Sequence, residues 1–184
     1  NKIIVLLPSN IKSGWENTIL NNKLDDNQCT GKTYISKLEE KNNNKEVKKI
    51  VSRNYDFTGY LKFANVVSKI MKMNNGRKQI KNLFSNRVII IDEVQRIRGD
   101  DDSKLILEVL EYIIKHSVNL KLILLSATPM YDKYTEFEFI INLLLKNDKR
   151  SDLINSTLLN DIINENNDTE LKSEIKQKFY KHII

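Results

Sequence analysis

The chain has 184 residues and contains very little cysteine, histidine, proline or glycine. The single cysteine, Cys29, excludes an internal disulfide. The two histidines, His116 and His182, lie too far apart in the sequence to suggest a structural zinc site. With 5 glycines and 2 prolines, the chain has little room for long linkers. No apolar run approaches the ~20 residues of a membrane span, and no signal peptide is visible.

The remaining composition is that of a globular domain, with 40% hydrophobic and 29% charged residues. A chain of this length buries about 70% of its unfolded surface, which is enough for a real core. The net charge of +6 permits a polyanionic partner, but ordinary solubility explains it equally well. Charge alone therefore leaves the function open.

Short apolar runs alternate with helical patterns along most of the chain. The apolar runs lie at residues 3–7, 50–51 with 55–57, 88–91 and 122–125. They are continuous, as in parallel strands that are covered on both faces. Helical spacing of apolar residues follows at residues 12–21, 61–73, 104–116 and 136–146. The alternation predicts an α/β domain with a parallel sheet and right-handed crossovers.

Two segments and the start of the chain are less regular. Residues 25–49 are polar and predict a surface loop with some helix. Residues 151–184 predict one or two amphipathic helices that leave the sheet, with a break near 164–168. The chain starts almost directly on an apolar run, without an initiating Met, so we expect a fragment whose upstream part is missing.

Two of the apolar runs stop abruptly at polar residues. The sequence RVIIIDEVQR occupies residues 87–96, and KLILLSATPM occupies residues 121–130. In a parallel sheet, ligands bind at the carboxyl ends of the strands, so these polar residues are candidates for chemistry. Asp92 suits a magnesium ion held through water, and Glu93 suits the orientation of an attacking water. The alternative is an acidic turn that caps the next helix.

Three stretches, in this order, resemble motifs Ia, II and III of the first RecA-like lobe of superfamily-two helicases and translocases. They are IVLLPSN at 4–10 with WEN at 15–17, DEVQ at 92–95, and LSATPMYD at 125–132. The segments 57–65 and 138–148 are similar to those of the branch that contains chromatin-remodeller-like ATPases and the poxvirus-type and mimivirus-type helicases of large DNA viruses. The resemblance covers about residues 1–150.

The resemblance implies an α/β RecA-like parallel sheet sandwiched by helices. This would be a partial P-loop NTPase lobe (residues 1–150) that lacks its first strand and Walker A loop, followed by a helical extension (residues 151–184). It implies ATP and Mg²⁺ as cofactors, with hydrolysis in the full-length protein and none in this fragment alone. The implied partners are DNA, gripped by its backbone, with RNA as the alternative, a second RecA-like lobe and viral transcription machinery. No membrane is implied, and the expected location is intracellular, in a virion or viral factory.

The resemblance also assigns roles to residues at the predicted strand ends. Motif III (Ser126, Ala127 and Thr128) would couple the nucleotide site to nucleic acid, with Gln95 as hydrogen-bond partner. The expected contacts with the nucleic-acid backbone are Ser9, Asn10, Lys12, Thr58, Tyr60 and Lys62. Helix capping is the simpler alternative for the serine and threonine hydroxyls. Trp15 is expected to be a packing anchor.

Two features depart from the family pattern. The Walker A loop is absent, and the sequence GKT at residues 31–33 does not replace it, because Asp26 occupies the position where a P-loop needs glycine. Gln95 stands where most relatives have histidine. Glutamine can donate and accept hydrogen bonds, but it has no proton equilibrium near neutral pH.

Two other functions fit the same motifs. One is a catalytically inactive nucleic-acid-binding or scaffold module of a transcription complex, which the change at Gln95 favours weakly and the intact Asp92–Glu93 pair disfavours. The other is a restriction-type translocase subunit, which a nuclease domain elsewhere in the full chain would distinguish.

Overall fold

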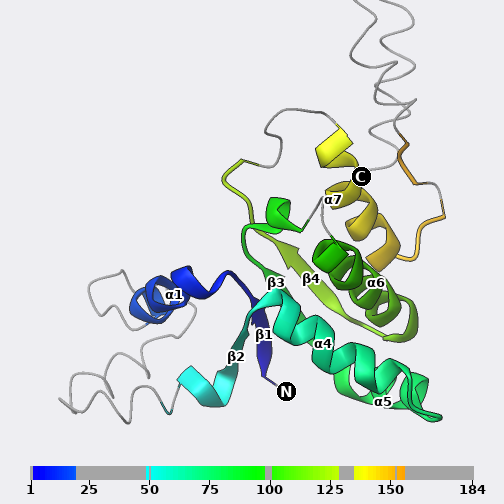
Figure 1. The fold of residues 1–184 in the computed structure, drawn as a ribbon, viewed down its shortest axis with the longest axis horizontal. Coiled ribbons are helices and arrows are strands. Elements are labelled where there is room, and N and C mark those ends of the chain that lie inside the picture. The colour runs from blue at the N-terminus through cyan, green and yellow to red at the C-terminus, as the bar shows by residue number, and fades with distance from the viewer. Residues whose placement is uncertain are drawn as a thin grey trace, which may run out of the picture.

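The computed structural model describes residues 2–19, 49, 51–97, 101–128, 135–151 and 153–155. Its centre is a four-stranded parallel sheet (Figure 1). The strands are β1 (Ile3–Leu6), β2 (Tyr55–Thr58), β3 (Val88–Ile91) and β4 (Lys121–Leu124), in the order β2-β1-β3-β4. The predicted α/β fold with a parallel sheet is confirmed. The GKT sequence, Cys29 and residues 156–184 lie outside the described residues.

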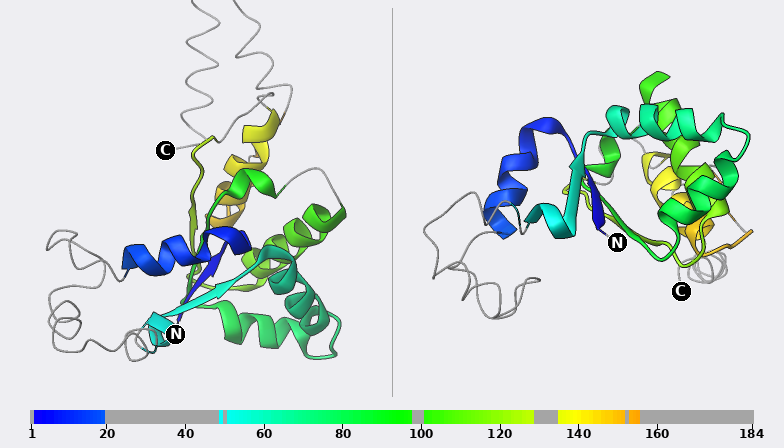
Figure 2. Two further views of the ribbon diagram at one scale, coloured as in Figure 1. Left: turned by 60° about the vertical axis from the view of Figure 1, so that its left-hand side comes forward. Right: turned by 90° about the horizontal axis from the view of Figure 1, so that it is seen from below.

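The helices lie on both sides of this sheet, but unequally (Figure 2). They are η1 (Ser9–Ile11), α1 (Lys12–Ile19), α4 (Tyr60–Met71), α5 (Gly76–Phe84), η2 (Val94–Arg96), α6 (Asp101–His116) and α7 (Thr135–Asn147). Helices α4 to α7 gather on one face, while α1 lies on the other side, next to β1 and β2. Within the described ranges, no helix is long and apolar enough to cross a membrane.

The core lies between the sheet and helices α4 to α7. Leu6, Ile89 and Ile91 are fully buried and face this layer. Val67 of α4 and Val109 of α6 meet them from the helical side, because the apolar residues of both helices recur at helical spacing. Burial of such side chains contributes about 1.5–3 kcal/mol each, so this layer dominates the stability of the sheet.

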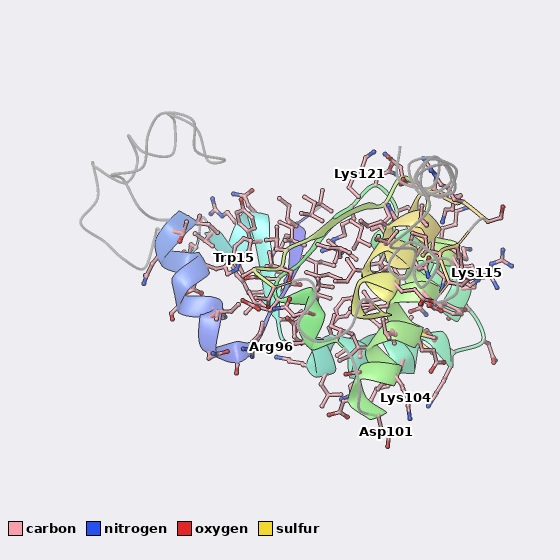
Figure 3. The ribbon with its side chains drawn as sticks, turned by 90° about the horizontal axis from the view of Figure 1, so that it is seen from above. Trp15, Arg96, Asp101, Lys104, Lys115 and Lys121 are labelled. Atoms are coloured by element: carbon pink, nitrogen blue, oxygen red, sulfur yellow. The ribbon has the colours of Figure 1, made fainter. Side chains whose placement is uncertain are left out.

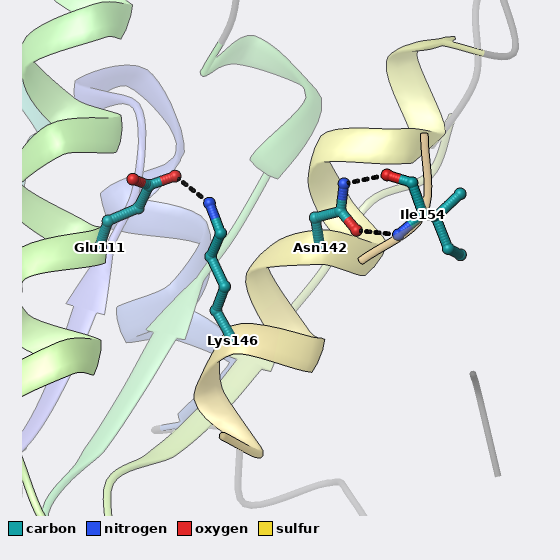
Figure 4. Close-up of polar contacts among 4 residues, drawn as sticks. All are labelled: Glu111, Asn142, Lys146 and Ile154. Carbon is teal, nitrogen blue, oxygen red and sulfur yellow. Dashed lines mark hydrogen bonds and ion pairs between the residues drawn. The ribbon is translucent and has the colours of Figure 1, made fainter. Parts of the chain in front are cut away.

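Asn142 and Lys146 of α7 tie that helix to its surroundings (Figure 4). Asn142 donates to the carbonyl of Ile154 at 2.7 Å and accepts from its N–H at 2.8 Å. Lys146 pairs with Glu111 of α6 at 2.6 Å. The ion pair is partly exposed and contributes at most about 1 kcal/mol, whereas Ile154 is buried and anchors the segment after α7.

Two sequence-based expectations were wrong, and one helix was not predicted. Residues 51–54 are helical, although Val51 was expected to lie in a strand. The hydroxyl of Ser52 donates to the carbonyl of Lys49, one turn earlier. Helix α5 was not predicted, because only two apolar side chains of its lysine-rich sequence, Ile80 and Phe84, are buried. The outer face of β4 is not covered within the described part of the chain, since Ile123 is 44% exposed.

Gly76 is needed where α5 begins, because a Cβ there would lie 2.3 Å from the carbonyl oxygen of Ile70. We expect Gly76→Ala to lower the free energy of unfolding by about 1–3 kcal/mol through overpacking. Gly14, in α1, has nothing within 4 Å of the same position. Gly14→Ala should therefore raise the free energy of unfolding by about 0.5–1 kcal/mol. Urea denaturation of both variants checks this, and equal effects would contradict it.

Candidate functional site

Backbone hydrogen bonds hold the carboxyl ends of all four strands at one edge of the sheet. The N–H of Asp92 donates to the carbonyl of Leu6 at 2.9 Å, and the N–H of Leu7 donates to the carbonyl of Thr58 at 3.1 Å. Leu125 donates to the carbonyl of Ile91 at 2.8 Å. The segments that follow the strands, which carry most of the predicted site residues, therefore start side by side.

Asp92 accepts hydrogen bonds on both of its carboxylate oxygens. Oδ1 accepts from the N–H of Glu93 at 2.9 Å, and Oδ2 accepts from Nε1 of Trp15 at 2.6 Å. The Trp15 ring also meets Phe57 edge-on, with centroids 6.3 Å apart, so the predicted packing contact is present. Figure 3 shows Trp15 between α1 and the strands. Because the acceptor is a charged carboxylate, the bond from Trp15 is roughly twice as strong as a hydrogen bond between two neutral groups.

The sequence did not predict the bond between Trp15 and Asp92, which lie 77 positions apart. A general signal was available, since a partly buried indole N–H usually finds an acceptor. The bond joins α1 to the end of β3. It therefore connects the predicted motif Ia directly to the predicted metal ligand.

Glu93 has a left-handed backbone, with φ 55° and ψ 43°. For a residue with a side chain, this conformation costs about 1–2 kcal/mol. The carboxylate of Glu93 accepts a hydrogen bond from Nε2 of Gln95. The turn thus holds a strained residue and fixes its carboxylate at the edge of the sheet, as is common at active sites.

Gln95 is buried, and its Oε1 has no hydrogen-bond partner in the described part of the chain. Its predicted partners lie in motif III, where the Ser126 hydroxyl accepts the N–H of Thr128 at 3.2 Å. The two segments are joined through the backbone instead, since Val94 donates to the carbonyl of Leu125 at 3.0 Å. A side-chain bond from Gln95 to motif III stays a prediction. Ala127 is exposed beside it.

Tyr60, at the start of α4, donates its hydroxyl proton to the carbonyls of Asp92 and Glu93, the latter at 3.4 Å. Burial, followed by the charge of Asp92, raises the pKa of Tyr60 well above its ordinary value. The hydroxyl therefore stays protonated and holds the acidic turn in place. The sequence had suggested Tyr60 as a contact for nucleic acid.

The other predicted nucleic-acid contacts surround this turn. Ser9 and Asn10 are exposed in η1, and Lys12 begins α1 with its Nζ 3.9 Å from Glu16. Thr58 ends β2 half-buried, and Lys62 is exposed in the first turn of α4. Ser9 and Asn10 lie in η1, and Lys12 begins the adjoining helix α1, which also carries Trp15, the hydrogen-bond donor to Asp92.

Comparison with known proteins finds two viral helicases. The chain is 25% identical over 154 residues to a protein of Acanthamoeba polyphaga mimivirus named as an ATP-dependent RNA helicase, covering 80% of this chain and 25% of that protein. It is 29% identical over 151 residues to a protein of Invertebrate iridescent virus 3 named as a helicase, covering 79% and 14%. This chain is related to the helicases of large DNA viruses. No protein-family model matches it, and no solved structure does.

The donors at this edge are of the kind that could hold a magnesium–nucleotide complex. Mg²⁺ keeps several waters and is usually held by one or two carboxylates together with substrate phosphates. Asp92 and Glu93 provide those carboxylates at the strand end. Among the described residues, no group of three or more His, Cys, Asp or Glu side chains is arranged so that it could hold a metal ion by itself. The unpartnered Oε1 of Gln95 leaves one buried acceptor for a water beside Glu93.

Tyr60→Phe removes the hydroxyl that bonds the acidic turn, so we expect it to lower the free energy of unfolding by about 1 kcal/mol at neutral pH. Because the folded pKa of Tyr60 is raised, its stabilisation is complete below the unfolded value of about 10 and declines as the pH rises above it. The deficit of Tyr60→Phe should therefore narrow above pH ~10. Urea denaturation across this range measures it.

Tyr112→Phe serves as the control, because the Tyr112 hydroxyl makes no hydrogen bond to any described residue. The control should show no such narrowing. A Tyr60→Phe deficit that is absent at neutral pH, or constant with pH, would show that the hydroxyl does not hold the turn.

Proposed function

We propose that the full-length protein is an ATP-dependent helicase or translocase of superfamily two, and that residues 1–150 form part of its first RecA-like lobe. One observation carries the proposal: Asp92 and Glu93 lie at the carboxyl edge of a parallel sheet, beside the segment that carries Ser126 and Thr128, and Asp92 is hydrogen-bonded to the helix that follows β1. The viral helicase relatives support the same class.

In this proposal, the two carboxylates have separate roles. Asp92 would hold magnesium through water, while Trp15 fixes the direction of its carboxylate. Glu93 would orient and polarise the water that attacks the γ-phosphate, with its own carboxylate held by Gln95. Bound magnesium would offset the negative charge of the phosphates. Tyr60 would keep the turn rigid as a neutral donor.

Coupling to nucleic acid would pass through α1. Ser9, Asn10 and Lys12 offer a hydroxyl, an amide and a cation near the start of this helix, a combination that suits phosphate oxygens. A displacement of α1 by bound nucleic acid would move Trp15 and thereby the carboxylate of Asp92. Contacts to the phosphate backbone of the nucleic acid read no bases, so movement of the protein along the nucleic acid would not depend on the base sequence. We favour DNA as the nucleic acid that the protein binds, with RNA as the alternative.

The chain spans 25% and 14% of the lengths of the two relatives. We therefore assign the phosphate-binding loop, the arginine finger and the second lobe to other parts of the full-length protein. The 184-residue chain alone should hydrolyse no ATP. Residues 151–184 would form a helical extension; the part of it that the structure describes returns to α7 through Ile154.

The test is the nucleic-acid-stimulated ATPase activity of the full-length protein with magnesium, for wild type and Glu93→Gln. The substitution keeps the shape of the side chain but removes the charge that polarises water, so we expect kcat to fall about a hundredfold or more. Binding of a fluorescent ATP analogue should persist. Glu108→Gln, at an exposed position of α6, makes the same chemical change away from the site and should leave turnover unchanged.

An inactive wild type, or a Glu93→Gln variant with normal turnover, would favour the scaffold function instead. Loss of both turnover and nucleotide binding would also count against the proposal, because it would place Glu93 in binding rather than in hydrolysis.

A further inference from the structure

A basic groove of about 710 Å³ lies where α5 begins, α6 ends and the chain leaves α7. Five exposed cations from these three segments line it: Arg77, Lys78, Lys81, Lys115 and Lys149. No carboxylate is among its described lining residues, and none of the five cations forms an ion pair with a described residue. Five like charges converge here without a counter-charge, so the groove is strongly positive.

The polar groups between the cations are mostly donors. Asn75 already accepts a hydrogen bond from Gln79 on its Oδ1, at 2.6 Å, which leaves its NH₂ as the free group. The first turn of α5 carries no acidic residue that would offset the partial positive charge of the helix N-terminus beside the groove.

The end of α6 would normally oppose this field, because its terminal carbonyls are partly negative. Here two of these carbonyls have hydrogen-bond donors. The carbonyl of Ile114 accepts from Lys149 Nζ, and the carbonyl of Ile113 accepts from the N–H of Ser117 at 2.9 Å. Lys149 has a left-handed backbone, with φ 62°, at a position where glycine is usual. A cation is therefore present there in spite of a cost of about 1–2 kcal/mol.

Ser117, which lines the groove, provides an independent sign of a missing partner. It is 3% exposed, and its hydroxyl has no hydrogen-bond partner in the described part of the chain. Buried hydroxyls are nearly always paired, and an unpaired one costs about 1–3 kcal/mol. A ligand oxygen in the groove, or a water held by that ligand, would satisfy it.

We propose that this groove binds the phosphate backbone of a nucleic acid. Phosphate oxygens accept from lysine, arginine, amide and hydroxyl donors, which is the set present in the groove, and successive phosphates of one strand can neutralise several cations at once. The groove adjoins the loop before β4, so it lies at the amino edge of the sheet, opposite Asp92 and Glu93. It is thus a second contact surface, and its test does not depend on hydrolysis.

The first experiment measures fluorescence anisotropy of a short labelled single-stranded oligonucleotide with the 184-residue chain over a range of salt concentrations. The groove variant combines Lys78→Gln, Lys81→Gln and Lys115→Gln. Three lost phosphate contacts should reduce the log–log salt slope by about 2, since each contributes about 0.7 on a single strand, and should weaken binding at low salt by about tenfold or more.

A matched control removes three charges elsewhere, with Lys49→Gln, Arg53→Gln and Lys104→Gln. All three residues are exposed, and none lines the groove. Because the net charge changes equally, the control should keep nearly the wild-type slope. In the wild-type chain, bound oligonucleotide should also protect Lys78, Lys81 and Lys115 from acetylation, as read by mass spectrometry, while Lys49 and Lys104 stay reactive.

Three results would overturn the proposal. In the first, the wild-type chain does not bind the oligonucleotide. In the second, the groove variant and the control variant weaken binding equally, which indicates attraction to the overall charge of the chain and not to the groove. In the third, polyglutamate protects the groove lysines from acetylation more strongly than the oligonucleotide does, which indicates an acidic protein partner instead.

Discussion

The candidate site depends on the parallel pairing of β1 with both β2 and β3. Because Leu6 pairs in register with Thr58 on one side and with Ile91 on the other, all three strands end at the same level. Backbone hydrogen bonds continue past the strand ends, from Asp92 to Leu6 and from Leu7 to Thr58. Segments that are far apart in the chain therefore present their polar groups at one edge, as open α/β sheets generally do.

On this frame, Asp92 is the point where separate elements meet. Trp15 reaches it from α1, Tyr60 holds its carbonyl from α4, and the turn that follows it forces Glu93 into a left-handed conformation. Such an arrangement stores strain in a small, well-anchored turn and limits the freedom of both carboxylates. It also gives α1 a direct hydrogen-bonded connection to the acidic turn, which the proposed coupling between nucleic-acid contact and hydrolysis would use.

Much of the frame was predictable from the sequence, because a buried parallel strand needs a continuous apolar run and its functional residues follow directly. The four strands and the acidic turn were found in this way. The bonds made by Trp15 and Tyr60 were not, since neither a side chain's partner nor a left-handed Glu93 follows from local spacing. Helix α5 was not predicted, because Ile80 and Phe84 are the only large apolar residues of its lysine-rich sequence that are buried. The basic groove joins three distant segments, so no single stretch of sequence indicates it.

The most direct measurement of the central claim is the indole N–H resonance of Trp15 in the 184-residue chain. The chain contains one tryptophan, so the ¹⁵N-labelled protein should give one such signal. If Trp15 donates to Asp92, the resonance should shift upfield in Asp92→Ala, because the carboxylate acceptor is lost. The same signal should stay almost unchanged in Glu93→Ala. A resonance that is the same in wild type and Asp92→Ala would contradict the claim that α1 and the acidic turn are joined.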